Sequence, residues 1–210
     1  MKKKLLIVAL SLMLVLTACS SSEPKKEEPK KTEEKVEEKK EETKTEEKKE
    51  ESTNNNADDS EIGKITKVIS KDVNIENNTN EFNTKITDVT ISTVEPNEKG
   101  VELLQTQEKK PTVIAVGYKV ENKTDKTLRF YPGQAPLITN TKEQIRPNLI
   151  LTEDIGGDFI GKVVKEGYAI YVSKSKPEEL KNLKIVIDAP DGEDYSSIGK
   201  NVEFNIDLTK

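Results

Sequence analysis

Short runs with the pattern of β-strands, separated by turn residues, occupy the last 150 positions of this 210-residue chain. Residues 201–208 show the pattern most clearly, because four apolar side chains fall on one face of an extended strand: Val202, Phe204, Ile206 and Leu208. No run after position 60 keeps the period of a helix, and Gly, Pro and Asn residues separate the runs. A strand with one apolar face must pair into a sheet whose face is covered by a second layer. The pattern therefore predicts an all-β, antiparallel sandwich.

The expected strands differ in strength. Clear strand patterns occupy 88–94, 112–120, 126–131, 168–172, 183–188 and 201–208, and weaker ones occupy 65–69, 73–75 and 145–151. Residues 112–120 are apolar on both faces, which is typical of a strand inside a sheet. In 168–172 the alternation places Tyr168, Ile170 and Val172 on one face and Tyr171 on the other. A single helical turn is expected at 177–182, where a proline stands first.

Residues 1–18 have the three parts of an export signal. Lysines occupy positions 2–4, a mostly apolar run of 12 residues follows at 5–16, and Leu16-Thr17-Ala18-Cys19 ends it with small residues before the cleavage point. Twelve helical residues span about 18 Å, which is too short for a hydrocarbon core of about 30 Å. The segment is therefore interpreted as a removable signal rather than a membrane span.

Leu16-Thr17-Ala18-Cys19 resembles the bacterial lipobox, in which the cysteine thiol receives a diacylglyceryl group before cleavage leaves that cysteine first. The resemblance implies cleavage between Ala18 and Cys19 and lipid attachment, palmitate included, at Cys19. It further implies a Gram-positive type lipoprotein on the extracytoplasmic face of the cell membrane, because two acyl chains hold a protein there without any span. The alternative is an ordinary secretory signal followed by an unrelated cysteine, although the chain contains no other cysteine.

Residues 20–60 are mostly Lys, Glu, Thr, Ser and Asn, and Val36 is their only apolar residue bulkier than Ala. Such a segment cannot bury enough surface to offset the entropy of ordering it. Favourable charge pairs three residues apart are balanced by like-charge pairs four residues apart, so we expect transient helix at most. We predict a lipidated cysteine and disordered spacer over 19–60 and one folded domain over 61–210. The spacer is interpreted as a tether into the cell wall; the alternative is a solubilising tail of no required length.

Composition excludes several kinds of chemistry. The chain has no His or Trp, both Met residues lie in the signal, and Cys19 is the only cysteine. These absences exclude zinc, haem, copper and iron–sulfur ligation, nucleophilic catalysis that needs His, and a disulfide within the chain, and we predict no cofactor. Residues 61–210 carry 21 basic and 24 acidic side chains, which gives no electrostatic basis for binding nucleic acid.

Residues 113–124, an apolar strand that ends in Glu121-Asn122-Lys123-Thr124, resemble the strand-then-Asn signature of immunoglobulin-like bacterial lipoprotein domains. Residues 161–172 are similar to that family's glycine-containing turn and following strand, and 183–187 fall where its next strand lies. A secreted mycobacterial antigen shares the architecture. The resemblance covers about 113–188 and implies an immunoglobulin-like antiparallel β-sandwich of unknown function. The disulfide and Trp of antibody domains are missing, and the family provides no catalytic residues to carry over.

Acidic side chains gather in two loops that contain glycine. Residues 188–199 hold the first set, and Gly156-Gly157 lies within the second; the two sets are Asp188, Asp191, Glu193 and Asp194, and Glu153, Asp154 and Asp158. Carboxylate oxygens bind calcium, so both loops are candidate calcium sites. The spacing fits no EF-hand loop, and Pro190-Asp191-Gly192 is an ordinary turn sequence. We therefore interpret both loops as solvated turns and predict no metal site.

Three aromatic residues, Phe130, Tyr131 and Tyr171, are candidates for a binding patch. The competing interpretation is that they cap the core of the sandwich. A pair of carboxylates could also serve glycoside hydrolysis, but among 24 acidic residues some pair reaches the required separation by chance.

The leading functional hypothesis is a non-catalytic, membrane-anchored domain that binds an envelope protein or glycan. The alternative is a carboxylate-dependent enzyme acting on the cell wall or a glycan, because without His or Cys only carboxylates, Lys or Tyr remain for catalysis. A transporter receptor is disfavoured, since such receptors usually need two α/β lobes and more residues than 61–210 provide.

Overall fold

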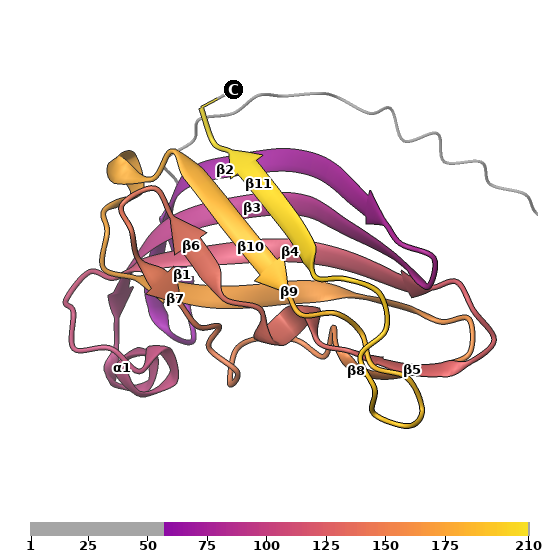
Figure 1. Ribbon diagram of the computed structural model, residues 1–210. Helices are drawn as coiled ribbons and strands as arrows, with labels where there is room; N and C mark the ends of the chain where they lie inside the picture. The colour runs from indigo at the N-terminus through magenta and orange to yellow at the C-terminus, as the bar shows by residue number, and fades with distance from the viewer. Residues whose placement is uncertain (1–56, 210) are drawn as a thin grey trace, which may run out of the picture. The chain divides into compact units, whose positions relative to one another are not determined.

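The structure, a computed structural model, describes residues 57–209, so the signal, Ala18, Cys19 and most of the spacer lie outside the described residues. A five-stranded antiparallel sheet has the order β1 (Ala57–Ser60), β2 (Gly63–Asn78), β3 (Phe82–Pro96), β4 (Thr112–Asn122) and β9 (Val164–Ser173). A four-stranded sheet has the order β11 (Val202–Asp207), β10 (Asn182–Ile187), β6 (Leu137–Thr139) and β7 (Gln144–Ile145). Strands β10 and β11 run diagonally across the first sheet (Figure 1).

Smaller elements complete the described part of the chain. Strands β5 (Thr127–Phe130) and β8 (Gly157–Ile160) form a separate antiparallel pair. Helix α1 (Glu98–Leu104) follows β3, and two 3₁₀ turns occupy Pro132–Gln134 and Pro177–Glu179. Strand β1 lies within 19–60, the range that the sequence analysis assigned to the spacer. No helix among the described residues is long and apolar enough to cross a membrane.

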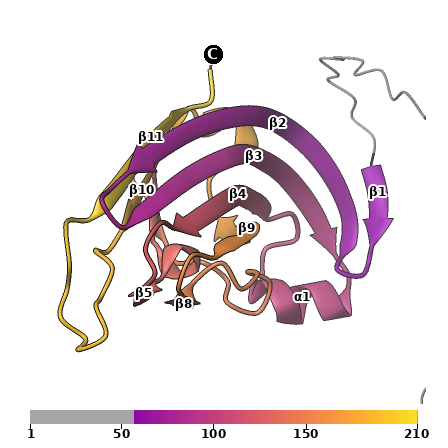
Figure 2. The same ribbon diagram turned by 90° about the vertical axis from the view of Figure 1, so that its right-hand side faces the viewer.

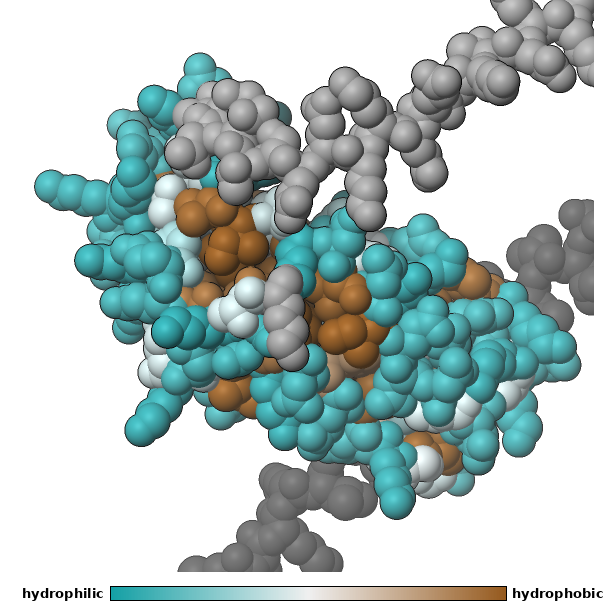
Figure 3. Space-filling view, turned by 90° about the horizontal axis from the view of Figure 1, so that it is seen from above, coloured by the Kyte–Doolittle hydropathy of each residue, from teal (hydrophilic) through white to brown (hydrophobic). Residues whose placement is uncertain are grey.

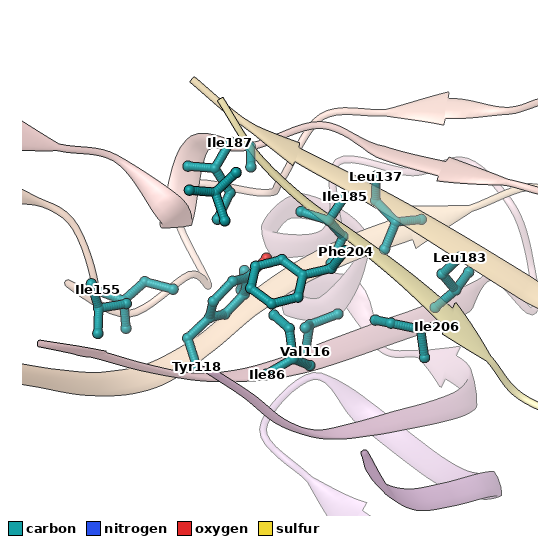
Figure 4. Close-up of a cluster of buried hydrophobic side chains, with 14 of the residues drawn as sticks. Ile86, Val116, Tyr118, Leu137, Ile155, Leu183, Ile185, Ile187, Phe204 and Ile206 are labelled. Atoms are coloured by element: carbon teal, nitrogen blue, oxygen red, sulfur yellow. The ribbon is translucent and has the colours of Figure 1, made fainter. Parts of the chain in front are cut away.

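The apolar faces of the two sheets meet in one core, which confirms the predicted all-β antiparallel sandwich. Figure 4 shows Ile86, Val116 and Tyr118 of the first sheet pointing toward side chains of the second. Those partners come from three strands: Leu137 from β6, Leu183, Ile185 and Ile187 from β10, and Phe204 and Ile206 from β11. All of these side chains are almost completely buried. The alternation in β10 and β11 therefore predicted the buried face correctly.

Bulges curve the long strands of the first sheet. The register between β2 and β3 shifts between Lys67 and Ile69 and again between Asp72 and Ile75, and each shift increases local twist. Strands β2 and β3 consequently arch over β4 and β9 (Figure 2). A third bulge in β3 turns the side chain of Asp88 toward Gly117 of β4, where an added Cβ would lie 2.3 Å from Asp88 Oδ1. A side chain at position 117 would therefore force the side chains of Thr87 and Asp88 to move.

The buried face of β9 is the one with fewer large apolar side chains. Ala169, Tyr171 and Ser173 face the core and are buried, whereas Tyr168 is 42% exposed. The pairing with β4 explains the difference, since Ala169 lies opposite Val116 and Tyr171 lies opposite Ile114, both of which are core residues. Opposed residues share a face of the sheet, so the register with β4 overrides the larger apolar content of the other face.

Two strand predictions need correction. The weak strands at 65–69 and 73–75 are parts of the single strand β2. The strand expected at 145–151 ends at Ile145, because Pro147 cannot donate to a sheet ladder and Asn148 forms a turn. Helix α1 was not predicted. Asn97 caps it by accepting a 2.8 Å hydrogen bond from Gly100 N, and only Gly100 and Leu104 are buried, too few to give a helical period.

Asn122 explains the strand-then-Asn pattern seen in the sequence. Its side chain is fully buried, and its Nδ2 donates to the carbonyl oxygens of Lys126, Phe159 and Gly161 at 2.9, 3.3 and 2.9 Å. Its Oδ1 accepts from the backbone and hydroxyl of Thr124, both at 2.9 Å. One amide therefore holds the end of β4, the following loop and β8 together.

Strand β11 and the part of β2 beyond its pairing with β1 approach each other on one side of the sandwich. Lys71 Nζ donates a 2.7 Å hydrogen bond to the Asp207 carbonyl oxygen across this gap. Apolar residues beneath it are only partly buried and pack against the core: Ile69, Val73, Ile75 and Leu208. Seen from this side, apolar surface shows between hydrophilic side chains (Figure 3).

Candidate functional site

Large apolar side chains are exposed at several positions of the described chain. Eight such residues are exposed, and only Val68 lies on β2. The other seven lie on β8, on β9 and in the loops that follow β5, β7 and β10: Tyr131, Leu149, Ile150, Ile160, Val164, Tyr168 and Tyr195. Two of these segments are joined by hydrogen bonds, since Asn148 N donates to Ile170 O and Glu153 N donates to Tyr168 O along the edge of β9. The turn that carries Leu149 and Ile150 is therefore attached to β9.

Asn148 fixes the turn that carries two of these residues. Its Oδ1 accepts from Ile150 N at 3.1 Å and from Leu151 N at 3.2 Å, and its Nδ2 donates to the Leu103 carbonyl oxygen at 2.7 Å. The turn is thereby tied to α1 as well as to β9, and Asn148 itself is buried. Leu149 and Ile150 nevertheless remain 65% and 58% exposed. The turn presents two large aliphatic side chains to solvent on a rigid support.

A groove of about 300 Å³ lies beside this turn. Its lining residues come from the segment before β6, from β7 and from the turn that follows β7: Gln134, Pro136, Gln144, Arg146, Pro147 and Leu149. We call these residues the Leu149 groove. Arg146 is the only charged residue in the lining, although charged residues make up 35% of the chain. Within residues 57–209 the Arg146 side chain, which is exposed, makes no ion pair or hydrogen bond.

A separate exposed residue, the aromatic Tyr195, lies against Arg129 of β5. The ring of Tyr195 stacks over Arg129, whose Cζ lies 3.8 Å from the ring centroid. Arg129 is held in place by Asp158, at 3.1 Å from Nε, and by the Gly192 carbonyl oxygen, at 2.9 Å from a terminal nitrogen. Tyr195 has a φ of 62°, in the left-handed region that non-glycine residues rarely adopt, and is 73% exposed. The stacking orients the ring on the outer face of the β5–β8 pair.

The acidic residues of loop 188–199 are engaged within the loop. Asp194 Oδ1 accepts from the Ser196 hydroxyl at 2.6 Å and from Ser196 N at 3.1 Å, and these bonds lower the pKa of Asp194. Asp191 Oδ1 accepts from the Ser197 hydroxyl at 2.9 Å. Asp188 lies 3.5 Å from Asn201 Nδ2, and Glu193 is exposed. Among the described residues, no three acidic, Cys or His side chains converge in a way that could hold a metal ion.

The carboxylates around Gly156-Gly157 have separate partners. Glu153 Oε2 accepts from Tyr168 N at 2.7 Å, Asp154 lies 3.4 Å from Lys165 Nζ, and Asp158 pairs with Arg129. The structure therefore does not bring these three residues into one site.

Among the described carboxyl groups, every resolved shift lowers the pKa. Burial raises the pKa of Glu143, but hydrogen bonds from Ser173, Ser175 and two backbone N–H groups outweigh burial and lower it. The pKa values of Glu61 and Asp194 are lowered by hydrogen bonds from Lys99 and Ser196. A general acid for glycan cleavage needs the opposite shift.

Of the three aromatic candidates for a binding patch, only Tyr131 is exposed. Phe130 and Tyr171 are buried in the core, as the competing interpretation expected. The sequence analysis missed Arg146, Leu149, Ile150 and Tyr195. A signal for the turn was present, because Pro147-Asn148 is a turn-forming pair directly before three large aliphatic residues. Nothing in the sequence pattern marks those residues as exposed.

No protein-family model matches the chain. The SPbeta prophage-derived uncharacterized lipoprotein YonS of Bacillus subtilis (strain 168) is 32% identical over 98 residues, which cover 45% of this chain and 48% of YonS. The chain thus spans about half the length of this curated relative. Since YonS is a lipoprotein, the similarity supports the prediction of a membrane-anchored bacterial lipoprotein.

A solved structure supports the fold. The crystal structure of a functionally unknown protein from Listeria monocytogenes EGD-e superposes with a TM-score of 0.55 at 14% identity, over 70% of this chain and 89% of that chain. At this identity the likeness shows a shared fold and nothing about activity.

Proposed function

We propose that the protein is a lipoprotein held by lipid on Cys19 at the extracytoplasmic face of the cell membrane, where its immunoglobulin-like domain binds another envelope component without catalysis. The observation that carries this proposal is the rigid exposure of Leu149 and Ile150 beside the Leu149 groove. The proposed immunoglobulin-like type agrees with a chain that passes from the first sheet to β6 and β7, returns at β9, and crosses again to β10 and β11.

Rigid apolar exposure is characteristic of a binding surface. An aliphatic side chain that served only stability would gain roughly 1.5–3 kcal/mol by being buried, and two adjacent residues forgo that gain here. Hydrogen bonds of Asn148 hold the turn in place, so the exposure does not result from a loose loop. Binding to preorganised apolar residues avoids the entropic cost of ordering them on association. A charge-depleted centre that contains Arg also matches the composition of protein interfaces.

Two observations favour binding over catalysis. The described carboxyl groups with shifted pKa values are all shifted downward, and the acidic loop residues have separate hydrogen-bonding partners. A carboxylate-dependent enzyme acting on the cell wall or a glycan needs two carboxyl groups with pKa values held apart over a shared site. The alternative enzyme therefore has less support than the binding domain.

The predicted tether would let an anchored domain reach its partner. Thirty-eight residue steps separate Cys19 from Ala57. A coil of that length averages about 35 Å end to end and can extend to about 130 Å. The domain would then sample positions close to the membrane and within the cell wall.

A photocrosslinking experiment in cells tests the proposal. The full-length protein is expressed in a Gram-positive host with a photoreactive amino acid at position 150, and the matched control carries it at position 68 on β2. We expect a discrete adduct from position 150 that is lost with Leu149→Ser and is missing from the position-68 control. Cys19→Ala should release the protein into the medium or leave it unprocessed. Equal adducts from both positions, or a cleaved Cys19→Ala protein retained on the membrane, would contradict the proposal.

A further inference from the structure

On the basis of the proposed function, we infer that the Leu149 groove binds an extended peptide segment of a partner protein in which a carboxylate stands two positions from a large apolar residue. The apolar side chain enters the groove against Leu149, and the carboxylate pairs with Arg146. The inference rests on charge, on the size of the groove and on its place at the edge of the second sheet.

Charge complementarity identifies the polar part of the ligand. Arg146 is the only charged residue of the groove and has no ion pair or hydrogen bond within residues 57–209. Elsewhere in the same part of the chain, most close Lys and Arg contacts are made with acidic side chains, such as Arg129 with Asp158 and Lys119 with Glu166. An unpaired guanidinium beside apolar surface presents a rigid fork of donors that fits a carboxylate. A carboxylate on the ligand would therefore form the ion pair that Arg146 lacks within the described residues.

The groove is sized for side chains. Its volume of about 300 Å³ lies at the lower limit of small-molecule sites, which range over roughly 300–1,000 Å³. It opens beside Leu149 and Pro147, which form its apolar wall, while Gln134 and Gln144 provide uncharged polar groups at its rim. One or two large apolar side chains fill a groove of this size, as happens where a short peptide docks.

The position of β7 favours an extended peptide. Strand β7 is the last strand of the four-stranded sheet, and its Gln144 lines the groove together with Arg146, two positions further on. An extended segment can add to such an edge, with backbone hydrogen bonds providing affinity and alternate side chains providing specificity. Alternate residues of an extended chain point the same way, which places the carboxylate and the apolar residue two positions apart.

A membrane surface is the competing partner, and local charge disfavours it. The turn continues directly into Glu153 and Asp154, both exposed, and residues 61–210 are acidic overall. Anionic lipids would be repelled by these groups, whereas a single carboxylate on a peptide can approach Arg146 alone.

The test uses the whole chain that follows the signal and Cys19, residues 20–210. Short random peptides displayed on phage are selected on this protein, and the enriched sequences are synthesised and titrated by fluorescence anisotropy. We expect Asp or Glu two positions from Leu, Ile or Phe, and a weakening of at least about tenfold with Arg146→Glu or Leu149→Ser. Arg146→Glu should bind better to peptides in which Lys replaces the acid. Val68→Ser, which removes an exposed apolar residue from β2, is the matched control and should leave the affinity unchanged.

Three results would overturn the inference. Enriched peptides without an acidic preference, or binding that survives both Arg146→Glu and Leu149→Ser, would show that the groove does not select this ligand. Sedimentation of the wild-type protein with phosphatidylglycerol vesicles, lost with Leu149→Ser, would assign the surface to the membrane. If the cellular adduct at position 150 forms but peptides show no acidic preference, the proposed function stands and this inference fails. If peptides bind as expected but no adduct forms in cells, the proposed function fails.

Discussion

The hydroxyl of Tyr171 donates a 3.0 Å hydrogen bond to the carbonyl oxygen of Ala135 and so joins β9 of the first sheet to the segment that leads into β6 of the second. Tyr171 is completely buried, and burial raises its pKa to about 12, although the nearby Tyr118 hydroxyl acts in the opposite direction. Burial raises the pKa of Tyr118 as well, and its proximity to Tyr171 raises it further. Both tyrosines are therefore kept neutral by the fold.

Stability should fall in alkaline solution because of this pair. In the unfolded chain a tyrosine loses its proton near pH 10, whereas in the folded protein Tyr171 keeps it until about pH 12. A folded pKa above the unfolded one gives a stabilising contribution that is complete below pH 10 and is lost as the pH rises through 12. We expect the urea midpoint to decline over this interval, with tyrosinate absorbance from two of the five tyrosines appearing only on unfolding.

Tyr171→Phe provides the control for this pH dependence. The variant leaves the Ala135 carbonyl oxygen without its donor, which should cost about 1–3 kcal/mol at neutral pH. Its stability should then decline less steeply above pH 10, because one of the two buried hydroxyls is gone. Titration of all five tyrosines in the folded protein, before any loss of structure, would contradict the assignment of Tyr118 and Tyr171 as buried neutral groups.

Replacing Tyr195 should separate backbone strain from side-chain stacking. Its φ of 62° costs a non-glycine residue about 1–2 kcal/mol, and the exposed stacking on Arg129 returns about 0.5–1 kcal/mol. Tyr195→Ala loses the stacking and keeps the strain, whereas Tyr195→Gly loses both. We expect Tyr195→Gly to be more stable than Tyr195→Ala by about 1 kcal/mol in urea unfolding.

Tyr168 offers a matched comparison, because it is also exposed but lies within β9 at an ordinary backbone conformation. There the order should reverse, with Tyr168→Ala more stable than Tyr168→Gly, since glycine weakens a strand. If Tyr195→Ala is also more stable than Tyr195→Gly, the backbone at Tyr195 is not strained.

Asn122→Asp should be one of the most damaging single-atom changes in the domain. The variant places a carboxylate oxygen where the two Nδ2 hydrogens are now shared among three carbonyl oxygens, so these bonds are lost and like partial charges meet. At about 1 kcal/mol for each donated hydrogen, with repulsion added, we expect a loss of at least about 2 kcal/mol at neutral pH. Protonating the new carboxyl group restores one donor, so the loss should shrink as the pH is lowered. Asn205→Asp, at an exposed position on β11, is the control and should have little effect.

What the sequence could predict depended on whether one face of a strand was plainly apolar. In β11 the alternation of Val202, Phe204 and Ile206 determines the buried face without reference to any other strand. In β9 both faces carry apolar residues, and the choice is made by the register with β4, which places Tyr171 opposite Ile114. That register is a long-range contact and leaves no mark in the local sequence.

The Leu149 groove was unpredictable for a related reason. An aliphatic run at 149–151 ordinarily indicates a buried strand. Here Asn148 forms a turn, and its contacts with Leu103 and Ile170 hold that turn at the surface. The groove then depends on β6 and β7 to bring Gln134 and Gln144 beside that turn. The absence of His and the single Cys follow from the sequence alone, and the chemistry that composition disfavours stays a prediction.

The thermal midpoint of the domain should be the same in EDTA and in millimolar calcium. The only protein ligands available are oxygens, and the carboxylates of loop 188–199 are engaged by neighbouring Ser196 and Ser197 rather than directed at a common point. A cation at 100 times its dissociation constant would stabilise the fold by about 2.7 kcal/mol, which corresponds to about 5–10 °C for a domain of this size. A calcium-dependent rise of that order would contradict this prediction if Asp191→Asn or Asp154→Asn removed it and the exposed control Glu203→Gln retained it. The acidic loops would then be assigned as a calcium site rather than as solvated turns.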